Sequence, residues 1–225
     1  MKKMMFSYKY GVESAVLTGM KTQTRRVITM TLHRDTGSAF VPIMPDEIFI
    51  DSDGVARFKL DGKTYTVPKQ NQPAYHVGEV VAIAQSYETL ANSHHSIGLK
   101  MFDSPTTINK AYCGKGWKNK MFVKAEYMPH HIRITDIRAE QLQAISNDDA
   151  KAEGVYRYKI PPLHHECDPY APWPPYIKPY KHDHDNLKYF CEARYAFMYL
   201  IDKISGTGTW CRNPWVYVYT FELID

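Results

Sequence analysis

The chain has 225 residues, of which 44% are hydrophobic and 23% are charged. These fractions are close to globular averages and exclude a disordered or fibrous chain. The formal net charge of +4 is mildly basic, well below the dense positive charge that is typical of non-specific duplex binding. The start of the chain lacks the apolar run of a secretory signal, and no later run reaches membrane-spanning length. We therefore expect a cytoplasmic protein without a membrane partner.

A short helix followed by a basic turn is predicted near the N-terminus. Val12, Ala15 and Val16 follow helical spacing, and Gly19 stands where a left-handed residue would end the helix. The next segment, KTQTRRVI, is expected to change from loop into strand.

Turn dipeptides divide the following segment into short strands. Residues 47–67 contain β-prone runs separated by Asp53-Gly54 and Asp61-Gly62, and these dipeptides favour tight hairpin turns. The pattern predicts a three-stranded meander, which we interpret as a surface insertion near residues 44–70.

Three further strands are predicted in the middle of the chain. The apolar run Val80–Ala84 indicates a buried strand, and Phe122–Tyr127 and Ile132–Ile134 indicate two more.

Two short helices should follow these strands. The first ends near Ile145, and Ser146 with Asp149 then forms a capping box that opens the second. Because Gly154 ends the second helix, Glu153 is expected in its last turn.

The C-terminal part combines an irregular segment, a helix and a strand. Residues 156–186 are rich in proline, histidine and tyrosine, which favours an irregular insertion. Asn186 is expected to open an apolar-striped helix that Gly206 ends, and Trp215–Leu223 indicates a strand.

Strands mixed with separate helices, without βαβ alternation, indicate an α+β fold with a small mixed sheet or partial barrel. We expect one domain, residues 1–225, carrying both insertions.

Groups that can bind an anion are concentrated where the first strand begins. They are Gly19, Lys21, Thr22, Thr24, Arg25 and Arg26. Donors and cations converging in one turn suit a phosphate, although an ordinary solvated run of charge is the alternative. The segment is not a P-loop, because the required glycine spacing and lysine-serine pair are absent.

Four segments, in chain order, carry a family resemblance. They are GMKTQTRR, HVGEVVAIAQSYE, MPHHIRITDIRAEQLQAISNDDAKAEGV and GTGTWCRNPWVYVYTFELI. Together they resemble the ASCH domain family of the PUA-like superfamily, and the last resembles phage-associated members. The resemblance implies a PUA-like mixed β pseudo-barrel flanked by helices, with a cleft proposed to bind RNA.

The resemblance also implies a possible catalytic trio. Some small ASCH members hydrolyse the amide of acetylated cytidine with a lysine, a threonine and a glutamate, and motif matching puts these roles on Lys21, Thr24 and Glu153. A desolvated lysine can activate a hydroxyl while a carboxylate orients it or carries protons. Residues three apart in a regular strand face opposite sides, so Lys21 and Thr24 need a turn between them. The alternative is a structural Lys21–Glu153 ion pair.

Other residues could contact a base. In the pattern of phage-type ASCH relatives, the strand after the Gly-acidic turn ends in a glutamate. The resemblance places Gln85 at that position in this chain, and its amide can bond a base edge. Trp210, Arg212 and Asn213 together could stack a base and bond its edge or a phosphate. Core packing is the alternative for the tryptophans and is favoured for Trp215.

One irregular set of residues resembles a metal site. It consists of His164, His165, Cys167, His182, His184 and Cys191. Imidazole and thiolate suit zinc, but the spacing fits no zinc-finger pattern, and the scattered cysteines fit reduced thiols. We therefore predict no bound metal and no cofactor.

The leading interpretation is a module that binds RNA, a nucleotide or a nucleoside. Its predicted contacts are Lys21, Thr22, Arg25, Arg26, Gln85, Trp210, Arg212 and Asn213. One alternative is a small hydrolase, either a nucleoside amidohydrolase or a ribonuclease, that uses Lys21, Thr24 and Glu153. Another is a phage-related accessory protein that acts through protein contacts.

Overall fold

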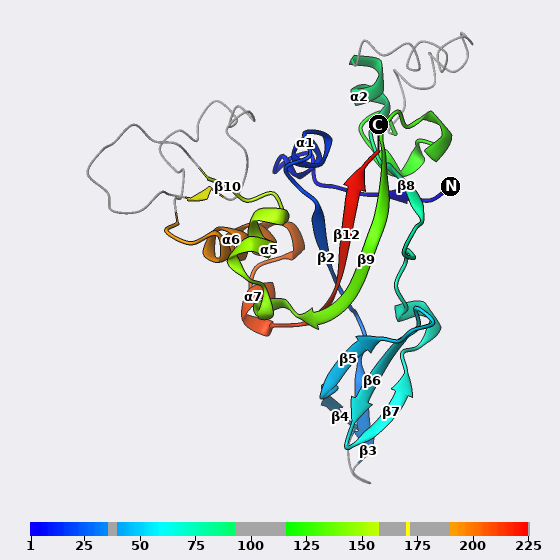
Figure 1. Cartoon of the computed structure of the whole chain (residues 1–225), viewed down its shortest axis with the longest axis vertical. Coiled ribbons are helices and arrows are strands. Elements are labelled where there is room, and N and C mark those ends of the chain that lie inside the picture. The colour runs from blue at the N-terminus through cyan, green and yellow to red at the C-terminus, as the bar shows by residue number, and fades with distance from the viewer. Residues whose placement is uncertain (36–39, 93–115, 158–169, 172–189, 225) are drawn as a thin grey trace.

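The computed structural model describes residues 1–35, 40–92, 116–157, 170–171 and 190–224, and its centre is a five-stranded mixed sheet (Figure 1). In sheet order the strands are β1 (Lys3–Met4), β8 (Val80–Ile83), β9 (His131–Gln141), β12 (Trp215–Leu223) and β2 (Gln23–Val27). β1 is parallel to β8, and the other neighbouring pairs are antiparallel. β12 has the predicted bounds.

Both faces of the sheet are covered, because successive residues of a strand point to opposite sides. Tyr217 and Tyr219 of β12 face the main core, which also contains Met4, Phe6, Val16, Ile132 and Ile134. Val216 and Val218 face a second, helical core. Its helices are α5 (Asn147–Ala152), α6 (Ala193–Ser205) and α7 (Thr209–Arg212).

The predicted helix ends are largely confirmed. α1 (Val12–Leu17) is followed by Gly19 with φ of +72°. The Ser146 hydroxyl accepts the Asp149 N–H at the start of α5, and Gly154 follows that helix with φ of +92°. α6 begins at Ala193, later than predicted: residues 190–192 are not helical, Glu192 is extended, and Asn186 lies outside the described residues. In the described part of the chain, no helix combines the length and apolarity needed to cross a bilayer.

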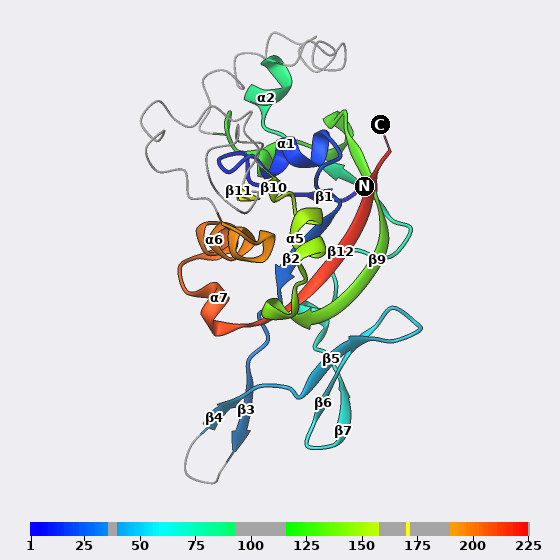
Figure 2. The same ribbon diagram turned by 60° about the vertical axis from the view of Figure 1, so that its left-hand side comes forward.

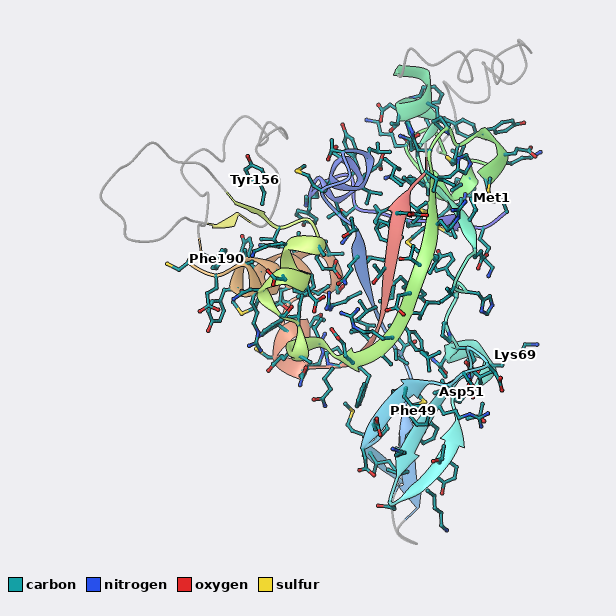
Figure 3. The ribbon with its side chains drawn as sticks, in the orientation of Figure 1. Met1, Phe49, Asp51, Lys69, Tyr156 and Phe190 are labelled. Carbon is teal, nitrogen blue, oxygen red and sulfur yellow. The ribbon has the colours of Figure 1, made fainter. Side chains whose placement is uncertain are left out.

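The meander is confirmed and lies at one end of the molecule. It consists of β5 (Glu47–Ile50), β6 (Ala56–Leu60) and β7 (Lys63–Thr66). A hairpin of β3 (Leu32–Asp35) and β4 (Phe40–Ile43) lies at the same end of the molecule. Figure 3 labels Phe49, Asp51 and Lys69 in this region. Ile48 and Phe58 pack in the main core, so the meander is anchored to the body.

Two strand predictions in the middle of the chain need correction. Residues 122–127 form no strand but lie in two 3₁₀ turns, Lys120–Phe122 and Ala125–Tyr127. The Asn119 side chain caps the first turn, and Phe122 is 65% exposed, so its apolar character does not reflect burial in a sheet. β9 extends far beyond Ile132–Ile134, because it pairs along the whole of β12.

Smaller elements complete the described chain. They are α2 (Tyr87–Asn92), the 3₁₀ turns Lys69–Asn71 and Leu142–Ala144, β10 (Tyr156–Arg157) and β11 (Tyr170–Ala171). β10 and β11 pair within the expected irregular insertion, and residues 158–169 and 172–189 lie outside the described residues.

The sheet curves without closing (Figure 2). β1 and β2 are its two edges, and within the described chain they are not hydrogen-bonded to each other. The Arg26 guanidinium of β2 donates to the carbonyl of Met5, which directly follows β1, and lies 5.8 Å from the centroid of the Phe6 ring. The architecture is therefore α+β with a mixed sheet, and the expected barrel is not closed among these residues.

Candidate functional site

A cavity of about 510 Å³ lies along β2. Its walls include Thr24, Arg25, Arg26 and Val27 of β2, with Lys21 and Glu153 near the start of that strand. Met5, Phe6 and Ser7 line one side, and Phe197, Leu200, Ile201 and Ile204 of α6 supply an apolar wall. Arg212 lies in α7 and also borders the cavity. The cavity therefore combines charged and apolar walls.

Lys21 and Glu153 meet although 132 positions separate them. The Lys21 N–H donates to the Ala15 carbonyl of α1, and the Thr22 N–H donates to the Ala152 carbonyl of α5. The segment that precedes β2 is therefore hydrogen-bonded to both helices. Lys21 Nζ contacts the Glu153 carboxylate and lies 2.9 Å from the Glu153 carbonyl oxygen. Both side chains are buried. The turn at Thr18–Gly19 precedes Lys21, which lies outside β2, so Lys21 and Thr24 are not both in the regular strand.

Gly154 allows Lys21 to lie close to the end of α5. A Cβ at Gly154 would lie 3.2 Å from Lys21 Cβ and 3.2 Å from Ala15 Cβ. Its φ of +92° is also unfavourable for residues other than glycine. Both restrictions make glycine the residue that this close approach requires.

Arg25 extends the buried Lys21–Glu153 pair into an ion cluster whose other members are partly exposed. Its Nη1 lies 3.0 Å from Glu153 Oε1, and its Nη2 lies 2.7 Å from Glu140 Oε1 and 3.5 Å from Asp149 Oδ2. Arg138 also contacts Glu140 and Asp149, at 3.2 and 3.0 Å. We call Lys21, Arg25, Arg138, Glu140, Asp149 and Glu153 the ion cluster. It holds three cations and three carboxylates, so its formal charges cancel.

Burial and neighbouring charges change the titration of the cluster. Burial lowers the pKa of Lys21, and the Glu153 carboxylate opposes that shift only in part. Partial burial raises the pKa of Asp149, but the Ser146 hydroxyl and the charges of Arg25 and Arg138 outweigh it. The pKa of Asp149 therefore lies below its usual value of 3.8.

Two arginines on the cavity wall lie outside the ion cluster. Arg26 donates to the Met5 carbonyl, and Arg212 lies 2.9 Å from Thr209 Oγ1 and 3.4 Å from the Thr207 carbonyl. Neither guanidinium forms an ion pair with a carboxylate of the described residues. Thr24 is on the same face of β2 as Arg26 and also borders the cavity.

Gln85 and Trp210, which the sequence predicted to contact a ligand, do not border the cavity. Gln85 is buried, its N–H points to Met128 Sδ, and it is not on the cavity wall. Trp210 is not a stacking surface but packs in the helical core under the Arg194 guanidinium, 5.5 Å from its ring. Trp210 is 9% exposed and belongs to the same core cluster as Phe197 and Ile201 of α6, so the core alternative holds.

Thr22 and Asn213, two further predicted ligand contacts, form hydrogen bonds with backbone groups instead. Thr22 is exposed, and its N–H and carbonyl bond Ala152 and Phe221. Asn213 has a left-handed conformation, and its Oδ1 accepts the Gln143 N–H at 2.7 Å. Neither residue borders the cavity.

The sequence did not reveal the apolar wall, nor the part that Arg138, Glu140 and Asp149 take in the ion cluster. The wall could have been inferred from the apolar stripe of α6, but not its position opposite β2. Arg138 and Glu140 are two residues apart on β9, so their side chains lie on one face of the sheet. This spacing is the sequence signal that could have placed them together. Their meeting with Arg25 depends on register, because Val218 lies opposite both Arg25 and Arg138.

The metal candidates fall mostly in parts of the chain that are not described. Only Cys191 of the set lies within the described ranges, where it is exposed. His164, His165, Cys167, His182 and His184 lie outside them. Within the described ranges, no three histidine, cysteine or acidic side chains gather as a metal site.

No family model matches this chain, and no match was found among curated proteins or solved structures. The function must therefore be argued from the cavity.

Proposed function

We propose that the cavity along β2 binds a nucleotide, either free or as part of single-stranded RNA. The observation that carries this proposal is the pair of wall arginines, Arg26 and Arg212, whose charges no described carboxylate balances. Guanidinium groups with open donors suit phosphate oxygens. The charges of the ion cluster cancel, so these two arginines give the cavity its excess positive charge.

The apolar wall supplies the other half of a nucleotide site. Phe197, Leu200 and Ile201 of α6 face the charged residues of β2 across the cavity. A nucleotide presents a flat, weakly polar base and an anionic phosphate, and ligand sites commonly pair an apolar lining with a few placed polar groups. The volume is also in the usual range for a small-molecule site.

The resemblance to ASCH domains supports the same proposal. The segment that carries Arg26 is GMKTQTRR, which resembles the opening motif of that family. We propose that the curved sheet is a PUA-like pseudo-barrel left open beside β2, with the ligand at the opening.

Binding of a fluorescein-labelled single-stranded RNA tests the proposal. The double variant Arg26→Gln, Arg212→Gln should bind at least about tenfold more weakly than wild type, because each guanidinium lost removes a charge-assisted hydrogen bond. The control is Lys63→Gln, Lys69→Gln, which removes two exposed cations at the meander end. Equal affinity in both double variants, or no binding of RNA or mononucleotides by wild type, would reject the proposal.

Amide hydrolysis is the second candidate, because Lys21, Thr24 and Glu153 all border this cavity. The Thr24 hydroxyl would attack an acyl carbonyl and pass its proton to a neutral Lys21 amine. The resulting ammonium would protonate the leaving amine as the C–N bond breaks, and water would then hydrolyse the acyl–threonine ester. Burial favours the neutral amine, but contact with Glu153 favours the ammonium. Lys21 Nζ is also held by Glu153, so this candidate ranks below binding.

Turnover of N4-acetylcytidine separates the two candidates. An amidohydrolase should lose most of its rate in Lys21→Ala, Thr24→Ala and Glu153→Ala, each checked for folding, because residues that act as a unit fail together. Thr22→Ala is the matched control, since Thr22 does not border the cavity. Turnover that survives the three substitutions excludes the trio. A wild type that binds RNA but shows no turnover of acetylated nucleosides or RNA leaves binding as the function.

A further inference from the structure

The outer edge of β2 carries backbone groups that no described strand uses. β2 is an edge strand that pairs only with β12. The Ile28 N–H bonds the Trp215 carbonyl, and the Thr22 carbonyl accepts from Phe221, both at 2.9 Å. Hydrogen-bonded pairs alternate in an antiparallel ladder, so Thr24 and Arg26 also bond β12. The N–H and carbonyl groups of Arg25 and Val27 therefore point away from the sheet.

The cavity covers this edge rather than one face of the sheet. It borders the four consecutive residues from Thr24 to Val27. Alternate residues of a strand face opposite sides, so a cavity on one face would border only every second residue. α6 forms its wall on the Arg25 face, and Met5 and Phe6 form its wall on the Arg26 face. The unpaired backbone groups of β2 thus form the floor of the cavity.

We propose that the outward N–H and carbonyl groups of Arg25 and Val27 bind the hydrogen-bonding edge of a nucleobase. In extended backbone, the donor and acceptor of one residue point in the same direction. They are complementary to the adjacent acceptor and donor that each nucleobase presents on its pairing edge. The inference rests on the proposed nucleotide function and assigns the base to β2 and the phosphate to Arg26 or Arg212.

The shape and charge of the site favour a nucleotide over an added peptide strand. An added strand of ordinary length spans about 17–20 Å, whereas this cavity of about 510 Å³ is walled on both sides of the edge. The unbalanced charges of Arg26 and Arg212 also call for an anionic ligand. A nucleotide meets both conditions, with its base against β2 and its phosphate toward an arginine.

A proline at position 27 tests the inference directly. Val27→Pro removes only an outward N–H, which edge strands tolerate because the ladder to β12 keeps its hydrogen bonds. Val27→Ala is the matched control, since it shortens the side chain and keeps the N–H. The probes are AMP, CMP, GMP and UMP, with ribose 5-phosphate as the ligand without a base, each titrated by calorimetry.

We expect wild type to bind at least one of the four nucleotides more tightly than ribose 5-phosphate. Val27→Pro should weaken binding of that nucleotide about tenfold and leave ribose 5-phosphate unchanged, whereas Val27→Ala should change both little. Nucleotide binding that is equal in Val27→Pro and Val27→Ala overturns the inference and leaves the proposed function standing. Failure of wild type to bind any nucleotide or RNA overturns both.

Amide hydrogen exchange gives a second measurement that needs no variant. In the wild type without ligand, the Arg25 and Val27 amides should exchange faster than those of Thr24 and Arg26, which bond β12. Saturation with the tightest-binding nucleotide should slow exchange at Arg25 and Val27. Bound nucleotide that leaves these two amides as fast as before contradicts the assignment, even if Val27→Pro does not fold.

Discussion

Arg25 and Arg26 are adjacent in the sequence, but the fold gives them opposite environments. The Arg25 guanidinium is fully buried and contacts three carboxylates, those of Glu140, Asp149 and Glu153. The Arg26 guanidinium contacts a backbone carbonyl and an aromatic ring at the cavity wall. The difference follows from the pleat of β2, which sends neighbouring side chains to opposite faces. A basic run in a strand therefore divides into ion-paired cations and cations that border the cavity without a described carboxylate partner.

Loss of each guanidinium in turn should give the largest contrast. Arg25→Gln leaves three carboxylates without their shared cation and should lower the free energy of unfolding by about 3–5 kcal/mol. Arg26→Gln loses one hydrogen bond to Met5 and should cost about 1 kcal/mol. Urea unfolding measures both. Equal losses for the two variants would break the distinction between the two arginines.

Adding a methyl group beside Lys21 should have the next largest effect. Gly154→Ala brings a Cβ within 3.2 Å of Lys21 Cβ at a positive φ, whereas Gly19→Ala meets no atom within 4 Å at a similarly positive φ. Both variants carry a conformational cost of about 1–2 kcal/mol. Thermal unfolding should show a further loss of about 1 kcal/mol or more for Gly154→Ala. If the two variants are equally stable, the end of α5 does not constrain Lys21.

The charge of Asp149 should have a smaller, pH-dependent effect. The folded pKa of Asp149 lies below 3.8, so its charge stabilises the fold above that pH, and the stabilisation is lost as pH falls through the folded pKa. Asp149→Asn should therefore be less stable than wild type by about 1 kcal/mol at neutral pH. The difference should shrink in acid below pH 3.8. A difference independent of pH would mean that the charge of Asp149 does not stabilise the cluster.

Local sequence signals predicted much of the fold. The turn dipeptides gave the meander, the capping box gave α5, and Trp215–Leu223 was correct because β-branched and aromatic residues dominate it. The expected strand at 122–127 was wrong because its apolar residues divide between exposed positions and a small satellite core around Val123. Such a partly buried run has the composition of a strand, but it has no neighbouring strand to pair with in the described part of the chain.

The site was less predictable, because it depends on contacts between distant segments. The resemblance brought Lys21, Thr24 and Glu153 into one hypothesis, and in the structure all three border the same cavity. The balancing of Lys21 and Arg25 by Glu140, Asp149 and Glu153 depends on the register of three strands and the position of α5. The surroundings of Trp210 likewise depend on where α6 lies, so its ring could not be assigned to the core from sequence.

The salt dependence of RNA binding tests the central claim most directly. Wild type, Arg26→Glu and the control Lys63→Glu would be titrated with one labelled single-stranded RNA over a series of salt concentrations. If Arg26 contacts phosphate, Arg26→Glu should bind more weakly, and the slope of log affinity against log salt should become shallower by about 0.7. Lys63→Glu should keep the wild-type slope. An unchanged affinity and slope in a folded Arg26→Glu variant would contradict the account, because the β2 cavity would then not be a phosphate-binding site.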